Sequence, residues 1–141
     1  MTAKEYLLEI KRLDRVIAER RMQAEEISYI RAQDTTREKV DTSPRGDALE
    51  KLAIKELSID VNSAIDDYMT VKNVIIGQIE RLGNAVYQNI LYDVYVHGMR
   101  LEEVAVKENY SHGYVKNMHI VALKAFQSRY KREIQAYCDL M

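Results

Sequence analysis

The sequence predicts an all-α protein, in which a long N-terminal helical hairpin, coiled-coil-like, is followed by a small C-terminal domain of shorter helices. Three observations lead to this fold class. The 141 residues include one proline and five glycines, so few residues interrupt helices. Apolar residues recur at spacings of three and four, the period of one helix face. The polar segment 34–46 separates two long stretches that have this period.

Two long helices are predicted before residue 83. The first covers residues 2–33, and its apolar stripe, interrupted by Arg20, consists of Tyr6, Ile10, Leu13, Ile17, Ala24 and Ile27. The second covers residues 47–82, and its heptad seam, interrupted by Gln78, consists of Ile54, Leu57, Val61, Ala64, Tyr68, Val71, Ile75 and Leu82. The segment between them, which includes Pro44, is predicted to be a loop. Similar helix lengths favour an antiparallel hairpin, and a dimer through the same seams is a compatible alternative.

Shorter helices are predicted after Gly83 and Asn84, which end the second long helix. A third helix covers residues 85–96 and ends at His97-Gly98. Two more helices follow, and their apolar faces consist of Leu101, Val104 and Ala105 in the first and Val115, Met118, Ala122, Leu123 and Phe126 in the second. The chain after Lys131 is expected to continue the last helix for a turn or two and then fray.

A corner at residues 109–111 joins the last two helices. Asn109 is expected to adopt the left-handed backbone that such a corner needs, and Ser111 is expected to be the N-cap of the next helix. This layout is that of a helix-turn-helix, which presents its second helix to the major groove of DNA. Residues 1–83 are therefore predicted to be an interaction or dimerisation arm, and residues 84–141 a DNA-binding domain.

The charge distribution favours the same function. No Asp or Glu occurs between Asn109 and Arg132, whereas basic residues are frequent there. The basic residues alone would be typical of an ordinary solvated helix face. They favour DNA binding only because they coincide with the predicted helix-turn-helix. The residues that point away from the core and are predicted to contact base edges are His112, Gly113, Lys116 and Asn117, with Ile120 on the same face. The predicted phosphate contacts are Arg100, Ser111, Tyr114, Lys124, Arg129, Lys131 and Arg132.

Other chemistry finds little support in the sequence. His112 and His119 share a helix face, but no Cys, Asp or Glu lies beside them, so no metal site is predicted. No nucleophile motif or phosphate-binding glycine loop is present, and we expect neither an enzyme nor a cofactor. The single Cys138 is compatible with a reducing cytosol, and the N-terminus lacks the features of a signal peptide. A cytoplasmic protein without a membrane span is therefore expected.

The run ILYDVYVHGMRLEEVAVKENYSHGYVKNMHIVALKAF, residues 90–126, resembles region 4 of bacterial sigma factors. The residues that carry the resemblance are a Tyr-rich helix ending at Gly98, then LEEVA, the YS corner and YVKNMHxxALKAF. The resemblance covers the last third of the chain and implies a winged-helix-like superfamily helix-turn-helix that reads a promoter −35 element and contacts RNA polymerase. It also implies base contacts at His112, Gly113, Lys116 and Asn117. LuxR-type response regulators share much of the motif.

The chain as a whole looks like small phage or prophage proteins, a group that includes relatives of late-gene transcription regulators. The stretch VDTSPRGDALEKL before a long helix is similar to that group. Two departures bear on function. We expect no segment that melts promoter DNA, because these 141 residues leave no room for one beside the long helices, and His112 and Gly113 stand where larger polar or basic residues are common in the family.

The resulting prediction is a sequence-specific transcription regulator of phage or prophage type that reads double-stranded DNA with the helix at about 111–127, as a homodimer held by its arm. One alternative is a protein adaptor that binds RNA polymerase or a phage partner through the seam at residues 54–82. The other is a small-terminase-like DNA packaging protein, which also joins a helix-turn-helix to long oligomerising helices.

Overall fold

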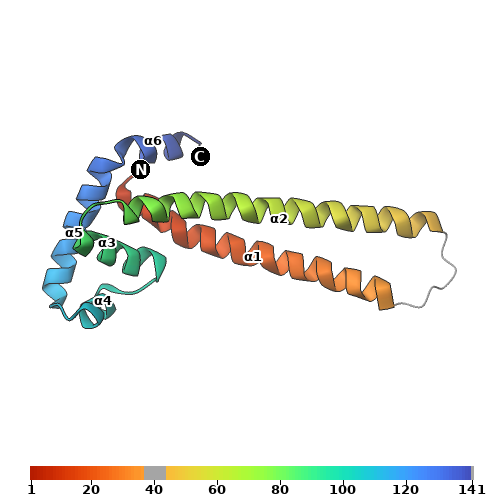
Figure 1. Ribbon diagram of the computed structural model, residues 1–141, viewed down its shortest axis with the longest axis horizontal. Coiled ribbons are helices and arrows are strands. Elements are labelled where there is room, and N and C mark those ends of the chain that lie inside the picture. Colours follow the sequence, from red (N-terminus) through yellow and green to blue (C-terminus); the bar gives the residue numbers. More distant parts are fainter. Residues whose placement is uncertain (37–43, 141) are drawn as a thin grey trace. The chain divides into compact units, whose positions relative to one another are not determined.

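The computed structural model describes residues 1–36 and 44–140, apart from the side chains at 31–36, 44–48, 50 and 54–59 (Figure 1). All elements in these ranges are helices, which confirms the predicted all-α class. In chain order they are α1 (Ala3–Thr36), α2 (Pro44–Glu80), α3 (Ala85–Leu91), η1 (Tyr92–Val96), α4 (Leu101–Glu108), α5 (His112–Arg129) and α6 (Lys131–Leu140). None of the helices in the described ranges is long and apolar enough to cross a membrane.

The chain divides into two compact units. The head unit consists of Met1–Leu13 and Val71–Met141, and the arm unit consists of Asp14–Thr70. The first turns of α1 and the last turns of α2 therefore belong to the same compact unit as the C-terminal helices. The division by function at residue 83 stays a prediction.

The arm unit contains the remaining parts of α1 and α2, which run antiparallel as the hairpin prediction requires. Ile17 and Val61 are buried between them, and Nη2 of Arg21 lies 3.9 Å from Sδ of Met69. The predicted seam residues Ile54 and Leu57 lie outside the described side chains.

The predicted loop at residues 34–46 is too long at both ends. Helix α1 continues to Thr36, and α2 already begins at Pro44. Proline suits the first position of a helix, because the N–H that it lacks would have no partner there and its fixed φ is already helical. Residues 37–43 lie outside the described part of the chain.

The start of α1 is buried in the head unit. Thr2 and Glu5 form a reciprocal capping box, in which each backbone N–H donates to the other side chain at 3.2 Å. The Tyr6 hydroxyl donates a buried hydrogen bond of 2.7 Å to Oε1 of Gln78 in α2, which satisfies the one polar residue of the seam. The Tyr6 ring packs against Phe126 of α5, with ring centroids 5.9 Å apart.

The predicted third helix, residues 85–96, changes type part-way. Asn84 caps α3 by accepting the N–H groups of Val86 and Tyr87, and the chain then continues as the π-helical turn η1. A π-turn carries an extra residue per turn and re-aims the side chains that follow. Asp93 and Tyr95 of this turn are buried, and Gly98, at φ +69°, follows the C-cap His97.

The prediction of a fraying C-terminal tail is wrong. Helix α5 ends at Arg129. Its C-cap, Tyr130, leaves the helical region with a φ of −110° and a ψ of 27°, and α6 begins at the next residue. Tyr130 is buried against Phe126, and Ile134 of α6 is also buried. These apolar contacts hold α6 as a separate helix in the head unit.

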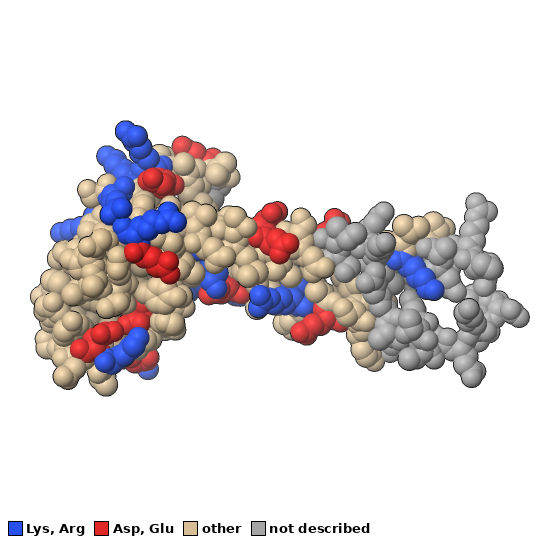
Figure 2. Space-filling view, viewed as in Figure 1, with Lys and Arg blue, Asp and Glu red and all other residues tan. Residues whose placement is uncertain are grey.

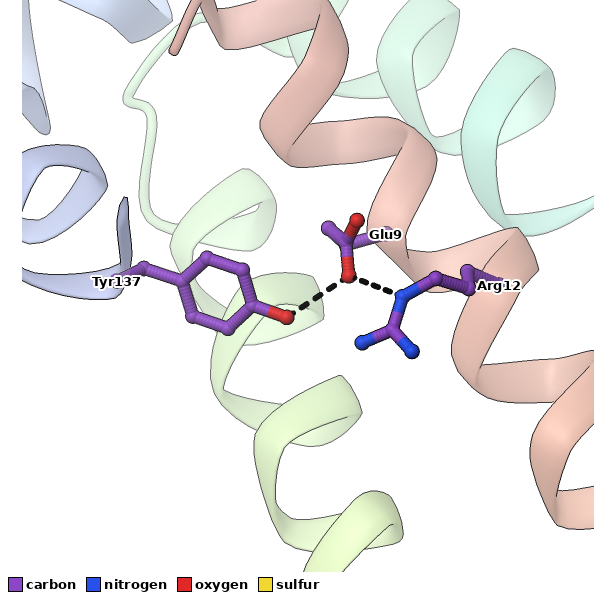
Figure 3. Close-up of polar contacts among 3 residues, drawn as sticks. All are labelled: Glu9, Arg12 and Tyr137. Atoms are coloured by element: carbon purple, nitrogen blue, oxygen red, sulfur yellow. Dashed lines mark hydrogen bonds and ion pairs between the residues drawn. The ribbon is translucent and has the colours of Figure 1, made fainter. Parts of the chain in front are cut away.

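A polar cluster joins α6 to α1 (Figure 3). The Tyr137 hydroxyl donates to Oε2 of Glu9 at 2.8 Å, and Nε of Arg12 donates to the same oxygen at 2.6 Å. Burial, followed by this hydrogen bond, raises the pKa of Tyr137, so the hydroxyl remains a donor at neutral pH.

We expect Tyr137→Phe to lower the free energy of unfolding of the head unit by about 0.5–1.5 kcal/mol, because Glu9 loses one donor while Arg12 remains. Urea denaturation monitored by circular dichroism measures this change. Tyr110→Phe, at the exposed α4–α5 corner, is the matched control and should change stability by less than about 0.5 kcal/mol. Equal stabilities of the two variants would contradict a stabilising role for the Tyr137–Glu9 contact.

Candidate nucleic-acid interface

The corner between α4 and α5 has the backbone that the sequence predicts. Asn109 adopts the left-handed conformation, with φ 59° and ψ 41°, and the N–H of Tyr110 donates to the carbonyl of Ala105 at 2.9 Å. Ser111 is the N-cap of α5, and its Oγ accepts the N–H of Tyr114 at 3.2 Å. The expectations for Asn109 and for the Ser111 cap are confirmed, and the direction of α5 is fixed by local hydrogen bonds.

The inner face of α5 is anchored in the core of the head unit. Val115, Ala122 and Phe126 are fully buried, and Val115 shares a cluster with Ile90, Val104 and Ala105 from α3 and α4. Since these residues recur at the helical period, the opposite face of α5 must point to solvent.

The structure leaves the four residues predicted to contact bases open to solvent. His112, Gly113, Lys116 and Asn117 are all exposed in the first half of α5. A Cβ at Gly113 would have nothing within 4 Å, so the fold itself leaves room for a side chain there. Helix α5 contains no Asp or Glu, and the structure therefore presents a face of neutral and basic groups only.

The residues predicted to contact phosphates fall into two groups. Lys124, Lys131 and Arg132 are exposed along the second half of α5 and the start of α6. Figure 2 shows Lys and Arg side chains, with Asp and Glu side chains among them, in the region where Figure 1 draws the end of α5 and the start of α6. These three side chains are available to an anionic partner.

The other four predicted phosphate contacts have partners within the protein. The Ser111 hydroxyl caps α5, and the Tyr114 ring packs edge-on against Tyr110 with centroids 4.9 Å apart. Nε of Arg100 donates to Oε1 of Glu103 at 3.0 Å, although both side chains are largely exposed. Arg129 donates a hydrogen bond to the carbonyl of Leu82, just after the end of α2.

Nη1 of Arg129 donates to the carbonyl of Leu82 at 3.3 Å, and its guanidinium lies 5.6 Å from the centroid of the Tyr130 ring. The Leu82 carbonyl lies just after the last turn of α2, where helix carbonyls lack backbone partners. Arg129 therefore has a structural role in the head unit, and its contact with a phosphate stays a prediction.

Sequence reasoning missed an ion pair that positions α4. Asp93 in η1 is 3% exposed, and its Oδ1 accepts a hydrogen bond of 2.7 Å from Nζ of Lys107 in α4. The second oxygen, Oδ2, is buried and has no hydrogen-bond partner. The contact with Asp93 raises the pKa of Lys107. The only signal in the sequence is an acidic residue within the apolar run 90–96, and nothing there indicates which basic residue pairs with it.

His119 is not part of the outer face. It is half-buried, its Nε2 lies 2.9 Å from the hydroxyl oxygen of Tyr95, and the two rings stack with centroids 5.7 Å apart. Burial, and then the positive charge of Lys4 in α1, lowers the pKa of His119 below its usual value of 6.5, and burial raises the pKa of Tyr95 to about 12. Both groups are therefore neutral in the folded protein at pH 7.

This pKa shift makes stability depend on pH. Because the unfolded chain binds a proton at His119 more readily than the folded chain, the free energy of unfolding should fall as the pH drops through 6.5 towards the lower folded pKa. We expect the stability difference between the wild type and His119→Gln to shrink over this range. Urea denaturation of both proteins between about pH 8 and pH 5 measures it. Parallel stability curves would contradict the assigned shift.

No family model, curated protein or solved structure matches the chain. Among the side chains that the structure describes there is also no group of three or more His, Cys, Asp or Glu placed to hold a metal ion. The α4–α5 pair and the exposed face of α5 are therefore the features of this structure that bear on function.

Proposed function

We propose that the protein is a sequence-specific DNA-binding transcription regulator of the phage or prophage type, and that α4 and α5 are the helix-turn-helix. In this proposal α5 enters the major groove of duplex DNA. The resemblance to sigma region 4 adds RNA polymerase as a further partner. The proposal includes a cytoplasmic location and no cofactor.

The observation that carries the proposal is the outer face of α5. Its first half exposes Lys116 and Asn117, whose side chains match the hydrogen-bonding edges of guanine and adenine, respectively. The inner face of the same helix is fully buried at three positions, so these groups are held on a rigid element. The absence of acidic residues from α5 avoids repulsion by the phosphates.

The second half of α5 and the start of α6 supply the charge that DNA binding requires. Lys124, Lys131 and Arg132 are exposed there and would contact the phosphate backbone beside the groove. Such contacts release counterions, and the affinity should therefore fall steeply as the salt concentration rises.

A homodimer through the arm unit would place two copies of α5 on one DNA site. The arm exposes large apolar side chains in Met22, Leu49 and Leu52, and Leu49 is 66% exposed. These side chains also favour the second candidate function, an adaptor whose arm binds another protein. Mass measurement in solution separates the possibilities: a dimer favours regulation, and a ring of many subunits favours a small-terminase-like packaging role.

The test is selection of bound sequences from a random duplex pool by the full-length protein, followed by anisotropy titration of the selected DNA. We expect an enriched sequence and a strong loss of affinity for the Lys116→Ala/Asn117→Ala double variant. Val106→Ala, which removes an 84% exposed apolar side chain of α4, is the control and should bind as the wild type does. No enrichment at moderate salt, or equal binding by the double variant, would contradict the proposal.

A further inference from the structure

An apolar side chain lies in the middle of the exposed face of α5. Ile120 is 47% exposed, and its neighbours on the same face, three or four residues away, are Lys116, Asn117 and Lys124. All three neighbours are exposed and polar. Ile120 points away from the buried residues Val115, Ala122 and Phe126, so the core of the head unit does not account for it.

The surroundings of Ile120 favour one kind of occupant. The face carries two lysines and no acidic residue, which suits a polyanion better than an ordinary protein surface. In the major groove of DNA the apolar feature of the base edges is the C5-methyl group of thymine. We propose that Ile120 reads a thymine methyl group, so that the recognised site contains an obligatory thymine. This inference rests on the proposed function of α5.

Helix geometry also predicts the distance in the DNA site between the thymine and the base that Asn117 contacts. Ile120 follows Asn117 by three residues, which is about 4.5 Å along the helix axis. Successive base pairs are about 3.4 Å apart along DNA. When α5 lies along the groove, the thymine is therefore one or two base pairs from the base pair that Asn117 contacts. Asn117 and Ile120 together would define a short step of the recognised sequence.

The experiment removes the methyl group alone. In the DNA selected by the full-length protein, each thymine is replaced in turn by deoxyuridine, which keeps every hydrogen-bonding group of the base. We expect one replacement, one or two base pairs from the position that Asn117→Ala affects, to weaken wild-type binding about fourfold, the equivalent of exposing one methyl group.

The variants decide whether Ile120 is responsible. Ile120→Ala should bind the thymine and deoxyuridine duplexes equally, while Val106→Ala should keep the wild-type preference. Ile120 is exposed, and thermal melting should show that its replacement leaves the head unit folded.

Three outcomes would overturn the inference. If the wild type binds a selected sequence but no deoxyuridine replacement matters, the inference is wrong and the proposed function stands. If Ile120→Ala retains the thymine preference, another side chain such as Val121 reads the methyl group, or Ile120 serves a protein partner. If no sequence is selected at all, the proposed function fails and the inference fails with it.

Discussion

We expect Phe126→Ala to lower the free energy of unfolding by about 3–5 kcal/mol, the range for truncating a fully buried aromatic side chain. Phe126 is 0% exposed, and its ring packs between Tyr6 of α1 and Tyr130 at the end of α5, with centroid distances of 5.9 and 4.8 Å. The cavity would therefore open where α1, α5 and the start of α6 meet.

Equilibrium urea denaturation, followed by the circular dichroism of the helices, measures the Phe126→Ala effect. Val106→Ala removes an exposed apolar side chain and should change stability by less than about 0.5 kcal/mol. A loss below about 1 kcal/mol for Phe126→Ala would mean that α1 does not pack against α5 in solution as described.

The second large effect concerns base recognition. We expect Asn117→Ala to weaken binding to the selected DNA by about five- to 150-fold, or about 1–3 kcal/mol, because two hydrogen bonds to one adenine are lost. The loss should be confined to one base pair: DNA with a different base there should bind the variant and the wild type with similar affinity. Anisotropy titrations of the two proteins against single-base variants of the site measure it.

Lys124→Ala is the matched control, since its side chain is exposed further along the same face. Its loss should weaken binding to all sequences alike and reduce the slope of log affinity against log salt by about 0.9. If Asn117→Ala behaved in this uniform way as well, Asn117 would not read a base, and the assignment of the recognition face would be wrong.

Local signals in the sequence were sufficient for the α4–α5 pair. Asn109 tolerates the left-handed backbone, Ser111 supplies a capping oxygen, and the spacing of Val115, Ala122 and Phe126 identifies the buried face. Each of these depends on a residue and its neighbours within one or two turns, which is the range over which sequence patterns determine structure.

Contacts between distant segments had no such signal. The packing of the first turns of α1 on the C-terminal helices depends on Tyr6, Tyr137 and Glu9, which meet only after the chain has folded. Leu7 is fully buried although it lies off the predicted apolar stripe.

Two other features depend on chain geometry rather than composition. The π-turn η1 depends on a change in hydrogen-bond register, and the residue pattern at 92–96 does not predict that change. Asp93 and Lys107 are fourteen residues apart and lie in two different helices, η1 and α4. For the DNA contacts, the structure shows which side chains are exposed, and their roles are those that we propose.

The central claim, that the outer face of α5 binds duplex DNA, is tested most directly by lysine acetylation of the full-length protein with and without selected DNA, read by mass spectrometry. Lys116 and Lys124 should lose reactivity when DNA is saturating, whereas Lys51 in the arm unit, which is also exposed, should stay reactive. Unchanged reactivity of Lys116 and Lys124 at saturating DNA would contradict the account.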